Sequence, residues 1–107
     1  MANPEYPILR AILATVARQT FPPGALYKLV VPKAGAEQNV DAYNLCDGTR
    51  TVTDIAKELK IDAANLRKRI LRWAEEGIVV RVEQDKATYP VHLYPLSPSA
   101  QKEADNA

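Results

Sequence analysis

The sequence predicts an α+β fold in which two helices joined by a tight turn precede a β-hairpin. Three observations support this order. Asp62 can accept the free N–H groups at the start of a helix over residues 63–76. Gly77 follows that helix, where a residue with positive φ is wanted. The β-branched run Ile78-Val79-Val80 then has the character of a strand.

The apolar spacing supports both helices. The first is expected over residues 53–59, with Thr51 or Thr53 as its cap. Its apolar side chains share one face: Ile55, Ala56 and Leu59. In the second helix, apolar side chains recur at intervals of four and three residues: Leu66, Ile70 and Trp73. We therefore expect Trp73 to be a large core residue and not a residue that stacks on a ligand.

These residues resemble the winged helix-turn-helix superfamily. The resemblance rests on two segments, Thr53-x-Ile55-Ala56-x-x-Leu59-x-Ile61 and Leu66-x-x-x-Ile70-x-x-Trp73-x-x-x-Gly77-Ile78-Val79. It implies a winged helix-turn-helix over residues 37–97, with an extra helix and strand before it. In that family the helix that corresponds to residues 63–76 reads the major groove of DNA. Because the same fold also serves protein binding, the resemblance leaves both functions open.

The remaining elements of residues 37–97 follow from shorter patterns. Residues 40–46 are expected to be the first helix of the motif, and the turn dipeptide Asp47-Gly48 ends it. The wing strands are predicted over residues 78–83 and 88–96, with the tip at residues 84–87. Within the second strand, a proline marks an edge position or a bulge.

The single histidine and the single cysteine are interpreted as structural residues. His92 should point to the opposite face from Val91 and Leu93, which predicts a surface or interface histidine. Cys46 is expected to be a small buried side chain, and one cysteine without a disulfide partner fits a reducing compartment. One cysteine and one histidine are too few ligands for a zinc site and form no convincing nucleophile–base pair. We therefore expect no catalytic site, metal or cofactor, and a protein that is not an enzyme.

Residues 1–36 are expected to form an arm of one helix and one strand, which serves as a dimerisation element. The helix is predicted over residues 7–19, and the strand over residues 25–31 (ALYKLVV) before Pro32. The helix carries more apolar side chains than a core of this size requires, and these form the expected dimer interface: Ile8, Leu9, Ile12, Leu13 and Val16. The alternative is a helix folded wholly onto its own wing or strand.

The bulk properties are those of a small globular protein. A chain of 107 residues is long enough for one domain with a modest core. No stretch approaches the length of a membrane span, so we expect a cytoplasmic location. Residues 98–107 are polar and are predicted to be a flexible tail.

Charge distribution indicates the side of the molecule that would bind nucleic acid. The net charge is only +1, but residues 50–73 hold seven basic and three acidic side chains. Residues 74–107 hold three basic and six acidic side chains. The residues expected to contact double-stranded DNA are Thr53, Ala63, Ala64, Asn65, Arg67, Lys68, Arg72 and Lys86. Arg69 lies on the same helix and either joins this cationic surface or packs sideways and pairs with Asp54 or Glu58.

The predicted wing tip argues against strong phosphate contact by the wing. The chain from the end of the first wing strand into the tip reads Glu83-Gln84-Asp85-Lys86, which places one lysine after two acidic residues. Lys86 and Arg81 are the only usable cationic contacts there. A transcriptional regulator of this kind would therefore depend on the helix over residues 63–76.

A second segment resembles small winged-helix peptide chaperones. It is NLCDGTRTV over residues 44–52, followed by Ile55-Ala56, and it is similar to the pyrroloquinoline quinone pathway chaperone and to leader-peptide recognition domains. In that group a peptide adds as a strand beside a hairpin and lies against a helix. The long hairpin after Gly77 and the cationic second helix depart from that pattern. This resemblance implies the alternative function, a protein-interaction module that binds a peptide or a partner protein.

Overall fold

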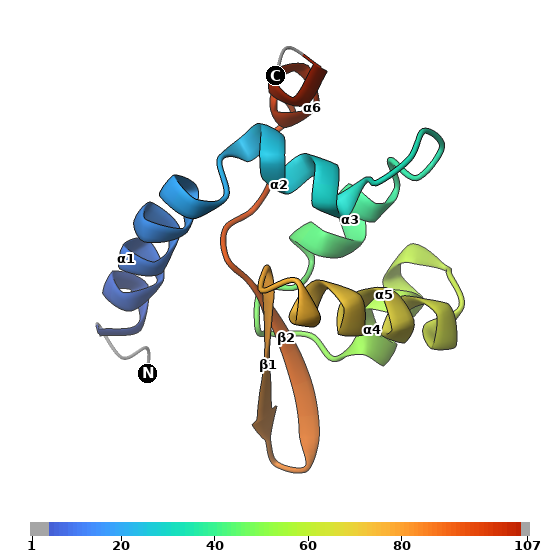
Figure 1. Ribbon diagram of the computed structural model, residues 1–107. Helices are drawn as coiled ribbons and strands as arrows, with labels where there is room; N and C mark the ends of the chain where they lie inside the picture. The colour runs from blue at the N-terminus through green and yellow to red at the C-terminus, as the bar shows by residue number, and fades with distance from the viewer. Residues whose placement is uncertain (1–4, 106–107) are drawn as a thin grey trace.

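Six helices and one antiparallel hairpin are formed by residues 5–105, the part of the chain that the computed structural model describes (Figure 1). The elements are α1 (Glu5–Thr20), α2 (Pro23–Val30), α3 (Asn39–Asn44), α4 (Val52–Leu59), α5 (Ala63–Glu75), β1 (Val79–Gln84), β2 (Ala87–His92) and α6 (Ala100–Asp105). The mixed α+β class is therefore confirmed. No helix within these residues is long and apolar enough to cross a membrane.

The α4–α5 pair forms as the sequence predicts. The Thr51 hydroxyl accepts the Asp54 backbone N–H at 3.2 Å, and the Asp54 carboxylate accepts the Thr51 N–H at 3.1 Å, which is a complete capping box. Asp62 caps α5 by accepting the Asn65 N–H at 3.0 Å. Gly77 follows with φ of +83° and turns the chain into β1. The capping role of Asp62 and the terminating role of Gly77 are confirmed.

The hairpin is regular and ends earlier than predicted. β1 and β2 pair from Val79 opposite His92 to Gln84 opposite Ala87. The two residues between them, Asp85-Lys86, both have positive φ, as a tight hairpin turn requires. The second strand therefore stops at His92 and does not continue to residue 96.

Pro90 occupies a position where its missing N–H costs no hydrogen bond of the hairpin. The Pro90 carbonyl accepts the Gly48 N–H at 3.1 Å, so the backbone N and O of Pro90 face residues 46–48 and not β1. Asp47 forms an isolated bridge with Val91 on the same side. The loop before α4 thus covers one edge of β2.

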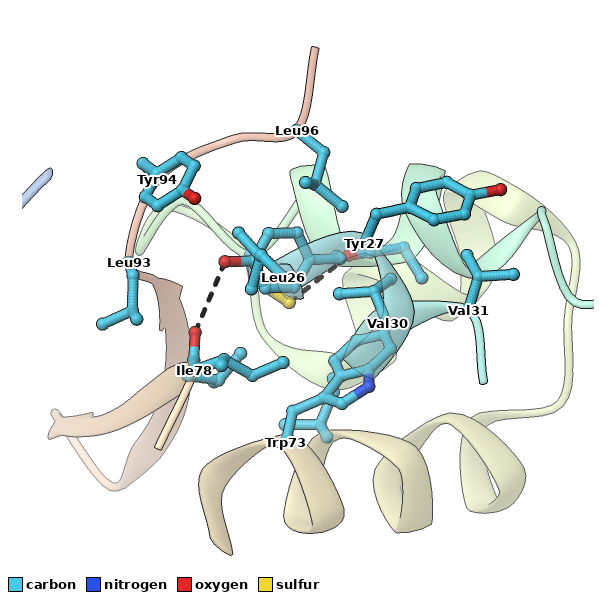
Figure 2. Packing of buried hydrophobic residues seen from close by; sticks show 14 of the residues in the cluster. Leu26, Tyr27, Val30, Val31, Trp73, Ile78, Leu93, Tyr94 and Leu96 are labelled. Carbon is cyan, nitrogen blue, oxygen red and sulfur yellow. Dashed lines mark hydrogen bonds between the residues drawn. The ribbon is translucent and has the colours of Figure 1, made fainter. Parts of the chain in front are cut away.

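The core lies where α2, α3 and α5 meet the chain that enters and leaves the hairpin. Figure 2 shows Trp73 reaching from α5 toward Val30, with Ile78 beside it. The Tyr43 and Trp73 rings meet edge to face, with centroids 5.7 Å apart. Trp73 and Cys46 are buried, so both core assignments are confirmed.

The prediction of a strand over residues 25–31 is wrong, because α2 occupies this segment. A proline takes the first helical position, where its missing N–H costs nothing. Leu26 and Val30, one turn apart, bury one face of the helix, whereas Lys28 is exposed. In a strand all three side chains would share a face, which would bury the lysine with the two apolar residues.

Residues 98–107 were expected to be a flexible tail and instead contain α6, although residues 106–107 lie outside the described part. The buried residues of α6 are Ala100 and Ala104. α6 packs closely on α2 at Gly24, where an added Cβ would lie 3.1 Å from backbone atoms of Glu103 and Ala104. Small residues on both helices permit this approach, and the docked helix closes one end of the core (Figure 1).

α1 stands at the side of the molecule, apart from α4 and α5 (Figure 1). The Arg10 guanidinium donates to the His92 carbonyl at 2.9 Å. The Tyr94 hydroxyl donates to the Phe21 carbonyl just beyond the helix, and the Arg18 guanidinium lies 4.6 Å from the centre of the Tyr94 ring. One side of α1 is thus attached to the chain that follows the hairpin.

His92 is buried, so the prediction of a surface or interface histidine is wrong. Its Nδ1 lies 3.0 Å from the Tyr43 carbonyl, and its ring lies 5.3 Å from the Tyr43 ring. The prediction assumed that residues alternate faces through Leu93. Because β2 ends at His92, the alternation stops there and both residues are buried.

Candidate nucleic-acid interface

α5 has one buried face and one cationic face. The buried face carries Leu66, Ile70 and Trp73. The exposed face carries Arg67, Lys68 and Arg72. In the described part of the chain, none of these three cations forms an ion pair with a carboxylate. They are therefore available to an anionic partner.

The start of α5 presents small and neutral polar side chains. Ala64 and Asn65 are exposed, whereas Ala63 is half-buried against the core. The Asn65 backbone N–H is bound by the Asp62 carboxylate, but the Asn65 side chain faces solvent. All three residues were predicted to contact DNA; Ala64 and Asn65 are accessible for this, whereas Ala63 also packs against the core.

Three residues that were predicted from the sequence to contact DNA line one hollow of about 360 Å³. Thr53 comes from the first turn of α4, Arg67 from α5 and Lys86 from the hairpin turn. Thr51 and Thr88 also line it. The N-terminus of α4 lies at the same place, where the Asp54 carboxylate of the capping box offsets part of the positive end of the helix dipole. Two cations, hydroxyl groups and a helix N-terminus are the groups that proteins present to a backbone phosphate.

Arg69 packs sideways, which was one of its two expected placements, but its partner is neither of the predicted carboxylates. The Arg69 guanidinium donates to the Asn39 side-chain oxygen at 3.0 Å and so ties α5 to α3. It does not pair with Asp54 or Glu58. Glu58 instead accepts from Arg50 at 3.4 Å. The pattern of charges gave no indication of Asn39, because its contact with Arg69 depends on how α3 packs on α5.

The hairpin turn is not a basic surface. All four residues of its tip, Glu83, Gln84, Asp85 and Lys86, are exposed. Lys86 reaches the hollow beside α4, whereas two carboxylates flank it on the hairpin. The hairpin therefore offers one cation to a phosphate backbone at this end.

The predicted dimer residues on α1 divide between two sides of the helix. Leu13 is half-buried and packs on the core of its own chain. The others lie on the outer side and are between 55% and 61% exposed: Ile8, Leu9, Ile12 and Val16. Four of the five predicted residues are therefore open to a partner.

An apolar groove of about 440 Å³ separates α1 from the outer face of the hairpin. Its apolar lining residues are Leu13, Val80, Val82, Tyr89 and Val91. This groove was not predicted from the sequence. The alternation of Val80 and Val82 with charged neighbours indicated one apolar hairpin face, but not that this face is open.

Burial also makes the one cysteine chemically inert. It raises the pKa of the Cys46 thiol to about 12, so the thiolate is scarce at neutral pH. Within residues 5–105, no group of three histidine, cysteine, aspartate or glutamate side chains is placed to hold a metal ion.

Comparisons with protein-family models, curated proteins and solved structures found no match for this chain. Function is therefore inferred from the fold and from the surface residues themselves.

Proposed function

We propose that residues 37–97 form a winged helix-turn-helix and that the protein is a small cytoplasmic transcriptional regulator that binds duplex DNA. The order α3, α4, α5 and hairpin supports the fold assignment. The short turn between α4 and α5 supports it too, as does the glycine before β1. In this proposal α5 is the helix that enters the major groove.

The observation that carries the proposal is the row of free cations on the exposed face of α5. Arg67, Lys68 and Arg72 would contact phosphates or guanine edges. Asn65 and Ala64, at the start of the helix, would lie nearest the bases. The hollow beside α4 would receive a flanking phosphate through Thr53 and Lys86. The acidic hairpin tip limits what the wing adds, so α5 would supply most of the affinity.

The proposal is tested by the salt dependence of duplex binding, followed by fluorescence polarisation. Replacing Arg67 and Lys68 together by alanine removes two phosphate contacts. We expect weaker binding between about 50 and 200 mM salt. The slope of the logarithm of the binding constant against the logarithm of the salt concentration should be smaller in magnitude by about 2, because each lost contact no longer releases roughly one counterion. Unchanged affinity and slope would remove α5 as the DNA-binding helix.

A matched control separates local contact from net charge. The double variant Lys28→Ala and Lys33→Ala also removes two exposed cations, but on α2 and the loop after it. We expect this variant to keep the wild-type salt slope. An equal loss of DNA affinity and of salt slope in both double variants would indicate unspecific attraction to the whole chain and would contradict the proposed interface.

The second candidate function is a module that binds a peptide or a partner protein. The open edge of β1 favours it, because within the described residues β1 pairs only with β2. An extended peptide can add to such an edge as a further strand. A pull-down from nuclease-treated lysate distinguishes the two functions: a protein partner is retained, whereas a partner bridged by DNA is lost.

A further inference from the structure

The exposed apolar side chains of this chain are not scattered over its surface. Seven large apolar residues are exposed in the part that the structure describes, and six of them lie on two elements. The six are Ile8, Leu9, Ile12 and Val16 on α1, and Val80 and Val82 on β1. The seventh, Leu71, lies on α5. Clustering of this kind marks an interaction surface.

α1 is apolar on two sides, and its own chain covers only one of them. The inner side packs through Leu13 and Ala17, while Arg10 and Arg18 attach the helix to residues near the end of β2. The outer side cannot turn toward its own hairpin without breaking these contacts. A helix that is apolar on opposite sides is typical of one enclosed between two layers.

The outer face of the hairpin provides a matching flat surface. Val80 lies opposite Val91 and Val82 lies opposite Tyr89, so cross-strand pairs form a continuous apolar face. Val80 is 50% exposed and Val82 is 44% exposed. This face and α1 border the same groove. A helix laid on a sheet face is one of the few ways in which proteins bury both surfaces.

We propose that a second copy of this chain occupies the groove. In the resulting two-fold dimer, the outer side of α1 from each copy lies on the outer hairpin face of the other. The sequence predicted a dimer through α1. The structure adds the hairpin as the surface that receives this helix, which gives the wing a role in assembly in addition to any contact with DNA.

The area and the charge of these surfaces favour a second copy. Six side chains that expose on the order of 100 Å² each give roughly 1,200 Å² for a reciprocal contact, the lower end of the range for stable interfaces. The one charged side chain that lines these surfaces is Arg10, whose guanidinium donates to the His92 carbonyl of its own chain, and the other lining side chains are uncharged. The outer side of α1 is lined by Ile8, Ala11, Ile12, Thr15 and Val16. The hairpin face adds Val80, Val82, Gln84, Tyr89 and Val91.

The mass of the protein in solution tests the contact, measured by light scattering or sedimentation at micromolar concentrations without DNA. We expect twice the chain mass of 11.8 kDa for the wild type. Ile12→Asp on α1 and Val82→Asp on β1 should each weaken dimerisation at least tenfold, because each buries two unpaired charges in a two-fold interface. Leu71→Asp is the matched control and should remain dimeric. A monomeric wild type, or an equal loss of dimerisation in the Leu71→Asp control, would overturn the proposal.

A cross-linking experiment identifies the paired surfaces. Ile12→Cys and Val82→Cys are made as separate chains, mixed and treated with a short bismaleimide. The native Cys46 is buried and its pKa is raised, so it should not react. We expect the linked product to form chiefly in the mixture, where the thiol introduced on α1 of one copy is joined to the thiol introduced on β1 of the other.

Two results of the cross-linking would overturn the inference. Efficient linking of Ile12→Cys to itself, without a gain in the mixture, would place α1 against α1 and leave the hairpin free. Absence of linking, with a monomeric wild type, would leave the groove to another partner such as a peptide. Because neither experiment contains DNA, failure here is distinct from failure of the DNA-binding proposal.

Discussion

Lowering the pH from about 8 to 5 should destabilise this protein through one buried side chain. His92 is the only histidine in the chain, and it is 4% exposed. Burial is the main cause that lowers its pKa below the ordinary value, and the nearby positive charge of Arg10 lowers it further, whereas the bond to the Tyr43 carbonyl and the charge of Asp47 oppose this shift without cancelling it. Nδ1 must carry the hydrogen that is donated to the Tyr43 carbonyl at 3.0 Å, because a carbonyl can only accept.

The sign and size of the effect follow from proton binding in the two states. As the pH falls through about 6.5, the unfolded chain takes up a proton on His92 while the folded chain does not, so unfolding becomes easier. The free energy of unfolding should therefore fall by at most about 1.4 kcal/mol per pH unit until the folded pKa is reached. The aspartates with lowered pKa values, Asp47 and Asp54, act only at lower pH, where carboxylates gain protons.

Urea unfolding at several pH values, followed by circular dichroism, measures this dependence. His92→Asn is the matched variant, because its amide can still donate to the Tyr43 carbonyl but does not titrate. We expect it to be less stable than the wild type at pH 8 and to show little pH dependence down to pH 5. A wild type with equal stability at both pH values, or a variant with the same slope, would refute the assignment of a buried neutral histidine.

Two further predictions concern the ends of α5. Gly77→Ala should destabilise the fold by about 1–2 kcal/mol, because φ is +83° there and a residue with a Cβ is strained in that conformation. No atom lies near enough to clash with the added Cβ, so the loss would come from the backbone alone. An unchanged temperature of thermal unfolding would contradict the backbone assignment. Asp62→Ala should cost about 1 kcal/mol through loss of the bond to the Asn65 N–H, whereas Asp62→Asn should retain most of the stability as a neutral cap. Equal losses in the two Asp62 variants would attribute the effect to charge and not to capping.

The sequence predicted the parts of the fold that depend on local patterns. The cap at Asp62, the spacing of Leu66, Ile70 and Trp73, and the positive φ of Gly77 are all encoded within about four residues of where they act. The same holds for the cationic face of α5. These features require no knowledge of what packs against them.

The errors arose where a tertiary contact decides the outcome. Residues 25–31 are rich in β-branched and aromatic side chains, which favour a strand locally, yet the burial of Leu26 and Val30 follows a helical period. α6 is short and polar, and its helix is supported by close packing on Gly24. The burial of His92 depends on where β2 ends.

The candidate site shows the same division. The exposed cations of α5 could be predicted from helical spacing alone. The hollow that joins Thr53, Arg67 and Lys86 could not be derived, because it depends on how the hairpin turn sits beside α4. The groove between α1 and the hairpin likewise combines residues about seventy positions apart.

The measurement that tests the central claim most directly is a titration of the ¹⁵N-labelled protein with a short DNA duplex, followed by amide chemical shifts. The proposal predicts that the shifts change on α5, at the first turn of α4 and around Lys86, and that the changes weaken as salt is raised. Amides on α1 and on the outer hairpin face should keep their positions. Chemical-shift changes confined to the groove between α1 and the hairpin, or no chemical-shift change at low salt, would contradict the assignment of α5 as a DNA-binding helix.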